Sequence, residues 1–176
     1  MRMSRGFSLI EVMVGVVITC VGILGMLALQ ARSIQQTQSA VSQSQAILLA
    51  DSLMELMRSN ASAALVDDQF TTASTYYKAA GSTFATTTAS NCLTRDRSAG
   101  GSTVASGDLA CWLQDVSKLL PVTDDILSAN FAICPSSAAD TCTTAASSVV
   151  MVQISWVDRT GLCTDNLCTY RLRSEL

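Results

Sequence analysis

The sequence predicts an α+β protein in which one long N-terminal helix precedes a small antiparallel sheet that disulfide bonds staple together. Three observations predict this class. An uncharged apolar run near the N-terminus continues into a helical pattern without a break. Short alternating apolar stretches, typical of strands, follow in the second half of the chain. Six of the seven cysteines lie outside the apolar run, and this even number suits three disulfides in an oxidising compartment.

Composition limits the classes of function that the chain can have. Its 176 residues are enough for one domain and an anchor, and 11 Lys+Arg against 14 Asp+Glu give a net charge of −3. We expect no nucleic-acid partner, because such proteins carry a basic patch. The chain contains no histidine, which excludes a Ser-His-Asp triad and a mixed Cys/His zinc site. It also lacks a Gly-rich phosphate loop, so we expect no enzyme, no metal and no cofactor.

The apolar run is long enough to span a membrane. Val12–Leu29 contains 18 residues without a charge, which falls in the length range of a transmembrane helix. It does not end in the small-residue cleavage site of a secretory signal. Arg2 and Arg5 precede the run, and the positive-inside rule keeps such a short basic leader in the cytoplasm.

Beyond the apolar run the pattern stays helical as far as about Asn60. Apolar residues recur there at roughly helical spacing: Ile34, Val41, Leu48, Leu53, Leu56 and Met57. We therefore predict one helix from Phe7 to Arg58, about 78 Å long at 1.5 Å per residue. Its first half is expected in lipid, and its second half is expected to be amphipathic and to pack on a periplasmic domain.

Small residues within the apolar half allow more than one interpretation. Gly15, Gly22 and Gly25 are either tolerated small residues, which are common in membrane helices, or sites of close helix packing or local unwinding. Cys20 is expected to be an unpaired apolar filler in lipid.

Glu11 lies at the mouth of the apolar run, where an unpaired carboxylate costs on the order of 2.5–3.5 kcal/mol on insertion scales. Residues 5–12, RGFSLIEV, resemble the processing motif of type IV pilins and type II secretion pseudopilins. The resemblance implies that a prepilin peptidase cuts between Gly6 and Phe7 and then methylates the new amine of Phe7. The mature chain would have 170 residues, which is 176 minus the six of the leader.

The same resemblance gives Glu11 a partner. The cationic amine of Phe7 on a neighbouring subunit would pair with the Glu11 carboxylate and offset much of the cost of burying either charge alone. The carboxylate would then set the register of helices that stack into a filament.

Longer stretches resemble the V-type minor pilins, the type IV pilus modification proteins called PilV. They read VGILGMLALQARSIQQTQ, ILLADSLMELMRSN, DLACWLQDVSKLLP (108–121) and VQISWVDR. The resemblance implies a minor subunit that primes assembly of the type IV pilus (fimbrium) and so affects twitching motility and cell adhesion. The implied partners are prepilin peptidase, other minor pilins, the major pilin and the inner-membrane assembly platform. The implied location is the inner membrane, with a single pass and a periplasmic C-terminal domain, and then the pilus near its tip.

Two alternatives remain open: a minor pseudopilin of a type II secretion system, and a membrane-tethered periplasmic adhesin or binding module. Glu11 argues against the plain tether, which gains nothing from a buried acid. The apolar helix has no proline, unlike that of many major pilins, which argues against the major subunit and leaves open how the helix bends.

The chain is expected to divide into a leader (1–6), a transmembrane or filament-core helix (7–29), the periplasmic half of the helix (30–59) and a globular α+β domain (60–176). Residues 60–107 are rich in Ser, Thr, Ala and Gly and predict loop with one short strand. Strands are predicted at Ile126–Ile133, Val149–Trp156 and Thr169–Arg173. This order of a long helix and then antiparallel strands matches the pilin fold.

A short amphipathic helix is predicted just before the strands. Its apolar positions are Leu109, Trp112, Leu113, Val116 and Leu120. Ser106 or Asp108 could cap it, Pro121 would stop it, and Trp112 is expected in the core.

Two acidic pairs are expected to be solvated turn residues rather than calcium ligands: Asp67 with Asp68, and Asp124 with Asp125.

Six cysteines allow 15 disulfide connectivities. Pairing within short loops is the economical expectation and gives Cys92–Cys111, Cys134–Cys142 and Cys163–Cys168. Pilins often carry a C-terminal disulfide loop, and either Cys163–Cys168 or a bridge from one of these to an earlier cysteine would provide it.

Overall fold

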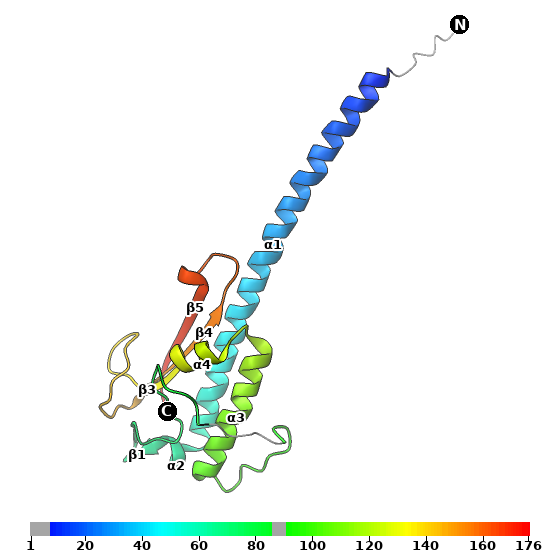
Figure 1. Cartoon of the computed structure of the whole chain (residues 1–176). Helices are drawn as coiled ribbons and strands as arrows, with labels where there is room; N and C mark the ends of the chain where they lie inside the picture. The colour runs from blue at the N-terminus through cyan, green and yellow to red at the C-terminus, as the bar shows by residue number, and fades with distance from the viewer. Residues whose placement is uncertain (1–7, 86–90) are drawn as a thin grey trace. The chain divides into compact units, whose positions relative to one another are not determined.

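The computed structural model describes residues 8–85 and 91–176. Within this part of the chain the elements are α1 (Leu9–Arg58), α2 (Ala61–Ala64), β1 (Leu65–Val66), β2 (Gln69–Phe70), α3 (Gly101–Leu119), α4 (Asp124–Ala129), β3 (Ala132–Pro135), β4 (Val149–Val157), the 3₁₀ turn η1 (Thr164–Asn166) and β5 (Leu167–Glu175) (Figure 1). The chain forms two compact units, one up to Ser39 and one from Ala40 to Leu176. The α+β class is confirmed, and the expected long helix is continuous from Leu9 to Arg58.

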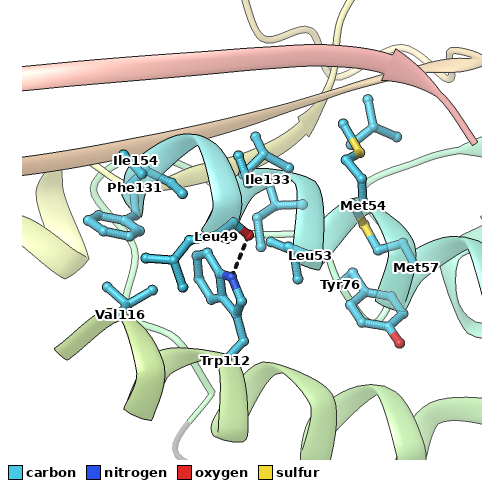
Figure 2. Packing of buried hydrophobic residues seen from close by; sticks show 14 of the residues in the cluster. Leu49, Leu53, Met54, Met57, Tyr76, Trp112, Val116, Phe131, Ile133 and Ile154 are labelled. Atoms are coloured by element: carbon cyan, nitrogen blue, oxygen red, sulfur yellow. Dashed lines mark hydrogen bonds between the residues drawn. The ribbon is translucent and has the colours of Figure 1, made fainter. Parts of the chain in front are cut away.

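The C-terminal part of α1 supplies one side of the core of the second unit. Its buried residues are Ala46, Leu49, Ala50, Leu53, Met54 and Met57. These positions follow the spacing of a single helix face, so one stripe of α1 turns away from solvent. Figure 2 shows Trp112 of α3 against this stripe, where its Nε1 donates a hydrogen bond to the carbonyl of Leu49 at 2.9 Å. Trp112 is 2% exposed, which confirms that it is a core residue.

The main sheet has the order β3-β4-β5, and both strand pairs are antiparallel. The predicted apolar face of β4 is buried in the same cluster as α1: Val150, Val152, Ile154 and Trp156. On the opposite face, Met151 packs with Ala132, Cys134 and Tyr77 in a second, smaller cluster. Both faces of β4 are therefore covered in its middle, which its alternating sequence does not indicate.

Helix α3 begins eight residues before the first predicted apolar position. Neither Ser106 nor Asp108 caps it, because both lie inside the helix. Its N-terminus is held by Asn60, whose Oδ1 accepts from the Gly101 N–H at 2.8 Å and whose Nδ2 donates to the Gly101 carbonyl at 3.0 Å. Gly100, just before the helix, has φ +60°, and a Cβ there would lie 3.3 Å from the Asn60 Oδ1. A local sequence pattern cannot indicate a cap that comes from a distant residue. For this reason the start of α3 was predicted incorrectly.

The predicted strand Ile126–Ile133 is wrong over most of its length: its first four residues belong to α4, and only Ala132 and Ile133 lie in a strand, β3. The Thr123 hydroxyl accepts from the Ile126 N–H at 3.4 Å and caps the helix. Asp124 and Asp125 occupy the first turn rather than a loop, where the helix dipole favours negative charge. The other two predicted strands are confirmed, with β4 one residue longer and β5 extending over Leu167–Glu175.

Residues 60–107 contain more structure than the predicted loop with one strand. Besides α2 and the start of α3, they form a β1–β2 hairpin in which Leu65 pairs with Phe70. Asp67 and Asp68 form its two-residue turn and are exposed, with φ of 52° and 59°. Both positive angles suit the twist of a tight hairpin, and aspartate tolerates them.

Three disulfides staple the second unit: Cys92–Cys111, Cys134–Cys142 and Cys163–Cys168. They are the pairs of the local scheme. Cys20 is a free, exposed cysteine in α1.

Candidate functional site

The processing site that the sequence indicates, Gly6 and Phe7, lies outside the described residues. The described residues begin with Ser8, whose carbonyl accepts from the N–H of Glu11 at 3.0 Å and of Val12 at 3.3 Å. Helix α1 therefore starts directly after Ser8, and Glu11 lies in its first turn.

The first unit presents its apolar side chains outward. From Leu9 to Leu29 every residue is exposed, among them the large hydrophobic residues Leu9, Ile10, Val12, Met13, Val14, Val16, Val17, Ile18, Val21, Ile23, Leu24, Met26, Leu27 and Leu29. Exposure of an apolar surface of this extent to water is unfavourable. The surface therefore requires lipid or other apolar helices around it. By length and composition α1 could cross a membrane.

Polar atoms within this segment are few, and the hydroxyl among them is satisfied inside the helix. The Thr19 Oγ1 donates to the Gly15 carbonyl one turn earlier at 2.8 Å. A Cβ added at Gly15, Gly22 or Gly25 would meet nothing within 4 Å, so these glycines leave flat, open patches on the helix. Glu11 is exposed, and its carboxylate is the acidic group of α1's first turn.

The second unit contains a buried polar cluster that sequence reasoning missed. Asp108 has no exposed surface, forms ion pairs with Arg95 and Arg97, and accepts a hydrogen bond from the Tyr76 hydroxyl at 2.6 Å. Burial and then the bond to Asp108 raise the pKa of Tyr76, so the phenol stays protonated. The sequence contained one signal for this cluster: the two arginines of TRDRS, Arg95 and Arg97, which follow Cys92 closely.

A second group gathers an acid and sulfur atoms near the β4–β5 turn. Oxygen and sulfur atoms of Asp158, Cys163 and Cys168 lie within 4.8 Å of one another, at metal-ligand spacing. The two sulfurs are bonded to each other. The Asp158 carboxylate accepts from the Thr160 hydroxyl at 2.6 Å and from the Leu162 N–H at 3.2 Å. These bonds, with the Thr160 hydroxyl first, lower the pKa of Asp158, and the group acts as the internal brace of a turn.

Comparison with known proteins locates the recognisable part of the chain at its N-terminus. Residues 1–27 match the family model described as the prokaryotic N-terminal methylation motif. No curated protein and no solved structure matches the chain. The match covers Gly6, Phe7 and Glu11 together with most of the exposed apolar segment. The chain therefore carries, in its first 27 residues, the N-terminal methylation motif of type IV pilin-like proteins.

Proposed function

We propose that the protein is a minor type IV pilin, a structural subunit that prepilin peptidase cleaves and N-methylates before it enters a pilus. The observation that carries the proposal is the methylation motif at residues 1–27, which includes most of an uncharged, exposed apolar run. The helix that contains this run continues without a break into a disulfide-stapled domain. This combination is not expected in a soluble enzyme or binding module, because the exposed apolar helix needs lipid or other helices around it.

The proposed site residues act in sequence. Gly6 provides a small, flexible backbone at the scissile bond. Cleavage leaves the amine of Phe7 at the new N-terminus, where it is methylated. Glu11 then pairs with that amine on a neighbouring subunit, since two opposite charges in low dielectric offset each other's burial cost.

Location follows from the same residues. Before cleavage, residues 7–29 hold the chain in the inner membrane by a single pass, with residues 30–176 on the periplasmic side, where disulfides form. After cleavage the subunit joins other minor pilins and the major pilin at the assembly platform, near the pilus tip. Priming of assembly, twitching motility and attachment are the expected consequences.

A minor pseudopilin of a type II secretion system is the second candidate, because RGFSLIEV resembles the motif of both groups. The resemblance of VGILGMLALQ, LADSLMELMRSN and DLACWLQDVSKLLP to V-type minor pilins favours the pilus.

Mass spectrometry of the N-terminus tests the processing step. In membrane and sheared-pilus fractions we expect a chain that starts at N-methylated Phe7. A Gly6→Val variant should retain Met1, because a β-branched side chain obstructs the cleft, whereas Ser4→Val in the same leader should be processed normally. An intact Met1 in the wild-type protein, found only in membranes, would overturn the proposal.

Assembly is tested separately with Glu11→Ala. This variant should be cleaved normally but be depleted from sheared pili by about tenfold, a loss equivalent to about 1.4 kcal/mol of pairing energy. Asp51→Ala is the matched control, because Asp51 is an exposed acid on the same helix outside the apolar segment. Equal incorporation of both variants would exclude the pairing role of Glu11. Recovery of the wild-type chain only with the secretion machinery would favour the pseudopilin.

A further inference from the structure

Residues 91–100, which we term the strap, form a closed ring with the first half of α3. At one end Cys92 is bonded to Cys111, and at the other end Gly100 leads directly into Gly101, the first residue of α3. The strap is tied at both ends to the helix that it crosses. Without the disulfide, only the Gly100–Gly101 peptide bond would join it directly to α3.

The strap brings two cations to one buried anion. Arg97 donates from Nε to the Asp108 Oδ1 at 2.9 Å and from Nη2 to the Asp108 Oδ2 at 3.0 Å, and Arg95 forms an ion pair with Oδ1. Asp108 lies one helical turn before Cys111. A buried carboxylate that loses its cations is strongly destabilising, so α3 depends on the strap for its charge balance.

The strap also reaches the end of α1. The Arg97 Nη2 donates to the Ser59 hydroxyl at 2.6 Å and to the Leu56 carbonyl at 3.4 Å. Leu56 is in the last turn of α1, where carbonyl groups have no partner within the helix. One guanidinium thus joins the strap, the buried acid of α3 and the C-terminal end of α1.

The bridge that holds the strap is the one of the three in which neither cysteine is buried. Cys92 is exposed and Cys111 is half-buried. Each of the other bridges contains a buried cysteine, Cys134 at 2% exposure and Cys168 at 5%. Cys142 is exposed as well, but an attack on it must release the buried Cys134 as a thiolate, which is a poor leaving group. At Cys92–Cys111 neither sulfur has this cost, so an external dithiol should reduce this bridge first.

We propose that Cys92–Cys111 is a redox-sensitive latch. While the bridge is intact, the strap keeps Arg95 and Arg97 on Asp108 and keeps Arg97 on the end of α1. When a dithiol reduces it, only the contacts of Arg95 and Arg97 still hold the strap on α3 and α1, and the strap opens more often. The inference does not depend on entry into a filament.

The chemistry balances as a thiol–disulfide exchange. One thiolate of the dithiol attacks Cys92 or Cys111, the S–S bond breaks, and a mixed disulfide forms. The second thiol of the reagent resolves it, so that the dithiol is oxidised to its own disulfide. Cys92 and Cys111 take up two electrons and two protons and become thiols.

Graded reduction of the purified full-length chain in detergent tests the latch without any mutation. Samples are treated with increasing dithiothreitol, alkylated, and mapped for modified cysteines and for tryptic cuts. We expect Cys92 and Cys111 to be alkylated at lower reagent concentration than the other four bridged cysteines. Over that range, cleavage after Arg95 and Arg97 should accelerate about tenfold, because strap opening exposes the backbone to the protease. Cleavage after Arg159, an exposed arginine in the β4–β5 turn, is the internal reference and should not change. Earlier reduction of another bridge, or an unchanged cleavage rate in the strap, would overturn the latch.

A mutant cycle then tests whether the bridge acts through Asp108. The Cys92→Ser/Cys111→Ser variant should show the same rise in strap cleavage, whereas Cys134→Ser/Cys142→Ser should not. In an Asp108→Asn background the arginines lack their anionic partner, so removing Cys92–Cys111 should add less than about twofold. If the full effect persists in that background, the bridge acts only by closing the chain, and the proposed link to Asp108 is wrong.

Discussion

Among single residues, Lys78 is a charged side chain that the fold buries without a carboxylate partner among the described residues. It is 3% exposed, and its Nζ donates to the carbonyls of Phe131 at 2.8 Å and Ser128 at 3.0 Å. The ring centroid of Phe84 lies 4.9 Å from the same nitrogen. Burial lowers the pKa of Lys78 to about 8 from 10.5. Carbonyls and a ring satisfy the amine without a carboxylate, so the charged form carries the desolvation cost.

Stability is therefore expected to rise with pH above about 8. Between this value and 10.5, the unfolded chain holds a proton on Lys78 that the folded protein has released. The free energy of unfolding should increase by up to about 1.4 kcal/mol per pH unit in this window. Urea unfolding from pH 7 to 9.5, followed by tryptophan fluorescence, measures it. The upper limit of pH 9.5 avoids ionisation of tyrosines in the unfolded chain. Because folding raises the pKa of Tyr76, that ionisation would lower the free energy of unfolding as the pH rises.

Two variants test whether Lys78 causes this pH dependence. Lys78→Met should flatten the rise, whereas Lys118→Met, at an exposed lysine on α3, should preserve it. A slope that survives Lys78→Met would show that another group is responsible.

Gly107 is a residue at which the ion pair and helix propensity act in opposite directions. It lies within α3, where alanine is favoured over glycine by about 1 kcal/mol. A Cβ at this position would collide with the Nη1 of Arg95, a side chain whose Nη2 is paired with Asp108. Gly107→Ala should therefore destabilise the wild-type protein but stabilise an Arg95→Ala background by about 0.5–1 kcal/mol. The same urea titration measures the change in the free energy of unfolding in both backgrounds. If Gly107→Ala changes it in the same direction in both, the steric explanation is excluded.

At the scale of elements, α1 combines two surfaces with opposite requirements. In its second half, Leu53 has no exposed surface, while Leu48 on another face is 67% exposed. Leu53→Ala should cost about 2–5 kcal/mol, because it opens a cavity between α1, the sheet and α3. Leu48→Ala, the same substitution on the same helix, should cost less than about 0.5 kcal/mol. If urea unfolding shows a similar loss of stability for the two variants, the face of α1 that contains Leu53 is not the one that packs on the domain.

The elements also show where sequence patterns succeed and fail. β4 and the second half of α1 were predicted from apolar periodicity, a local property that burial of one face imposes, and the first half of α1 from its long uncharged apolar run. α3 was predicted too short because its N-terminal cap comes from Asn60, and α4 was missed because the apolar pair Ile126 and Leu127 suits either a strand or a helix. The Thr123–Asp124–Asp125 start signal was present and outweighs those two residues.

For the whole molecule, the proposed topology predicts a simple protease pattern. Protease added to spheroplasts should digest the periplasmic residues and leave a protected fragment that contains the apolar segment Leu9–Leu29. A cytoplasmic marker should stay intact until the membrane is permeabilised. Complete protection of the chain in sealed spheroplasts would contradict the proposed orientation.

The sequence by itself determined the features that depend on neighbours along the chain. The motif at residues 1–27, the uncharged run, the long helix and the strand periodicity of β4 all follow from residue order within short windows. The local disulfide scheme also rests on proximity in sequence, and it names the bridges found in the structure.

Only the tertiary structure decided what happens between distant segments. It placed Asp108 in the core rather than at a helix cap, and it brought Arg97 to both Asp108 and the end of α1. It buried Lys78 among carbonyls that lie about 50 residues away, at Ser128 and Phe131. The physical reason is that a buried charge must find partners wherever the fold supplies them, and their position in the sequence leaves no periodic trace.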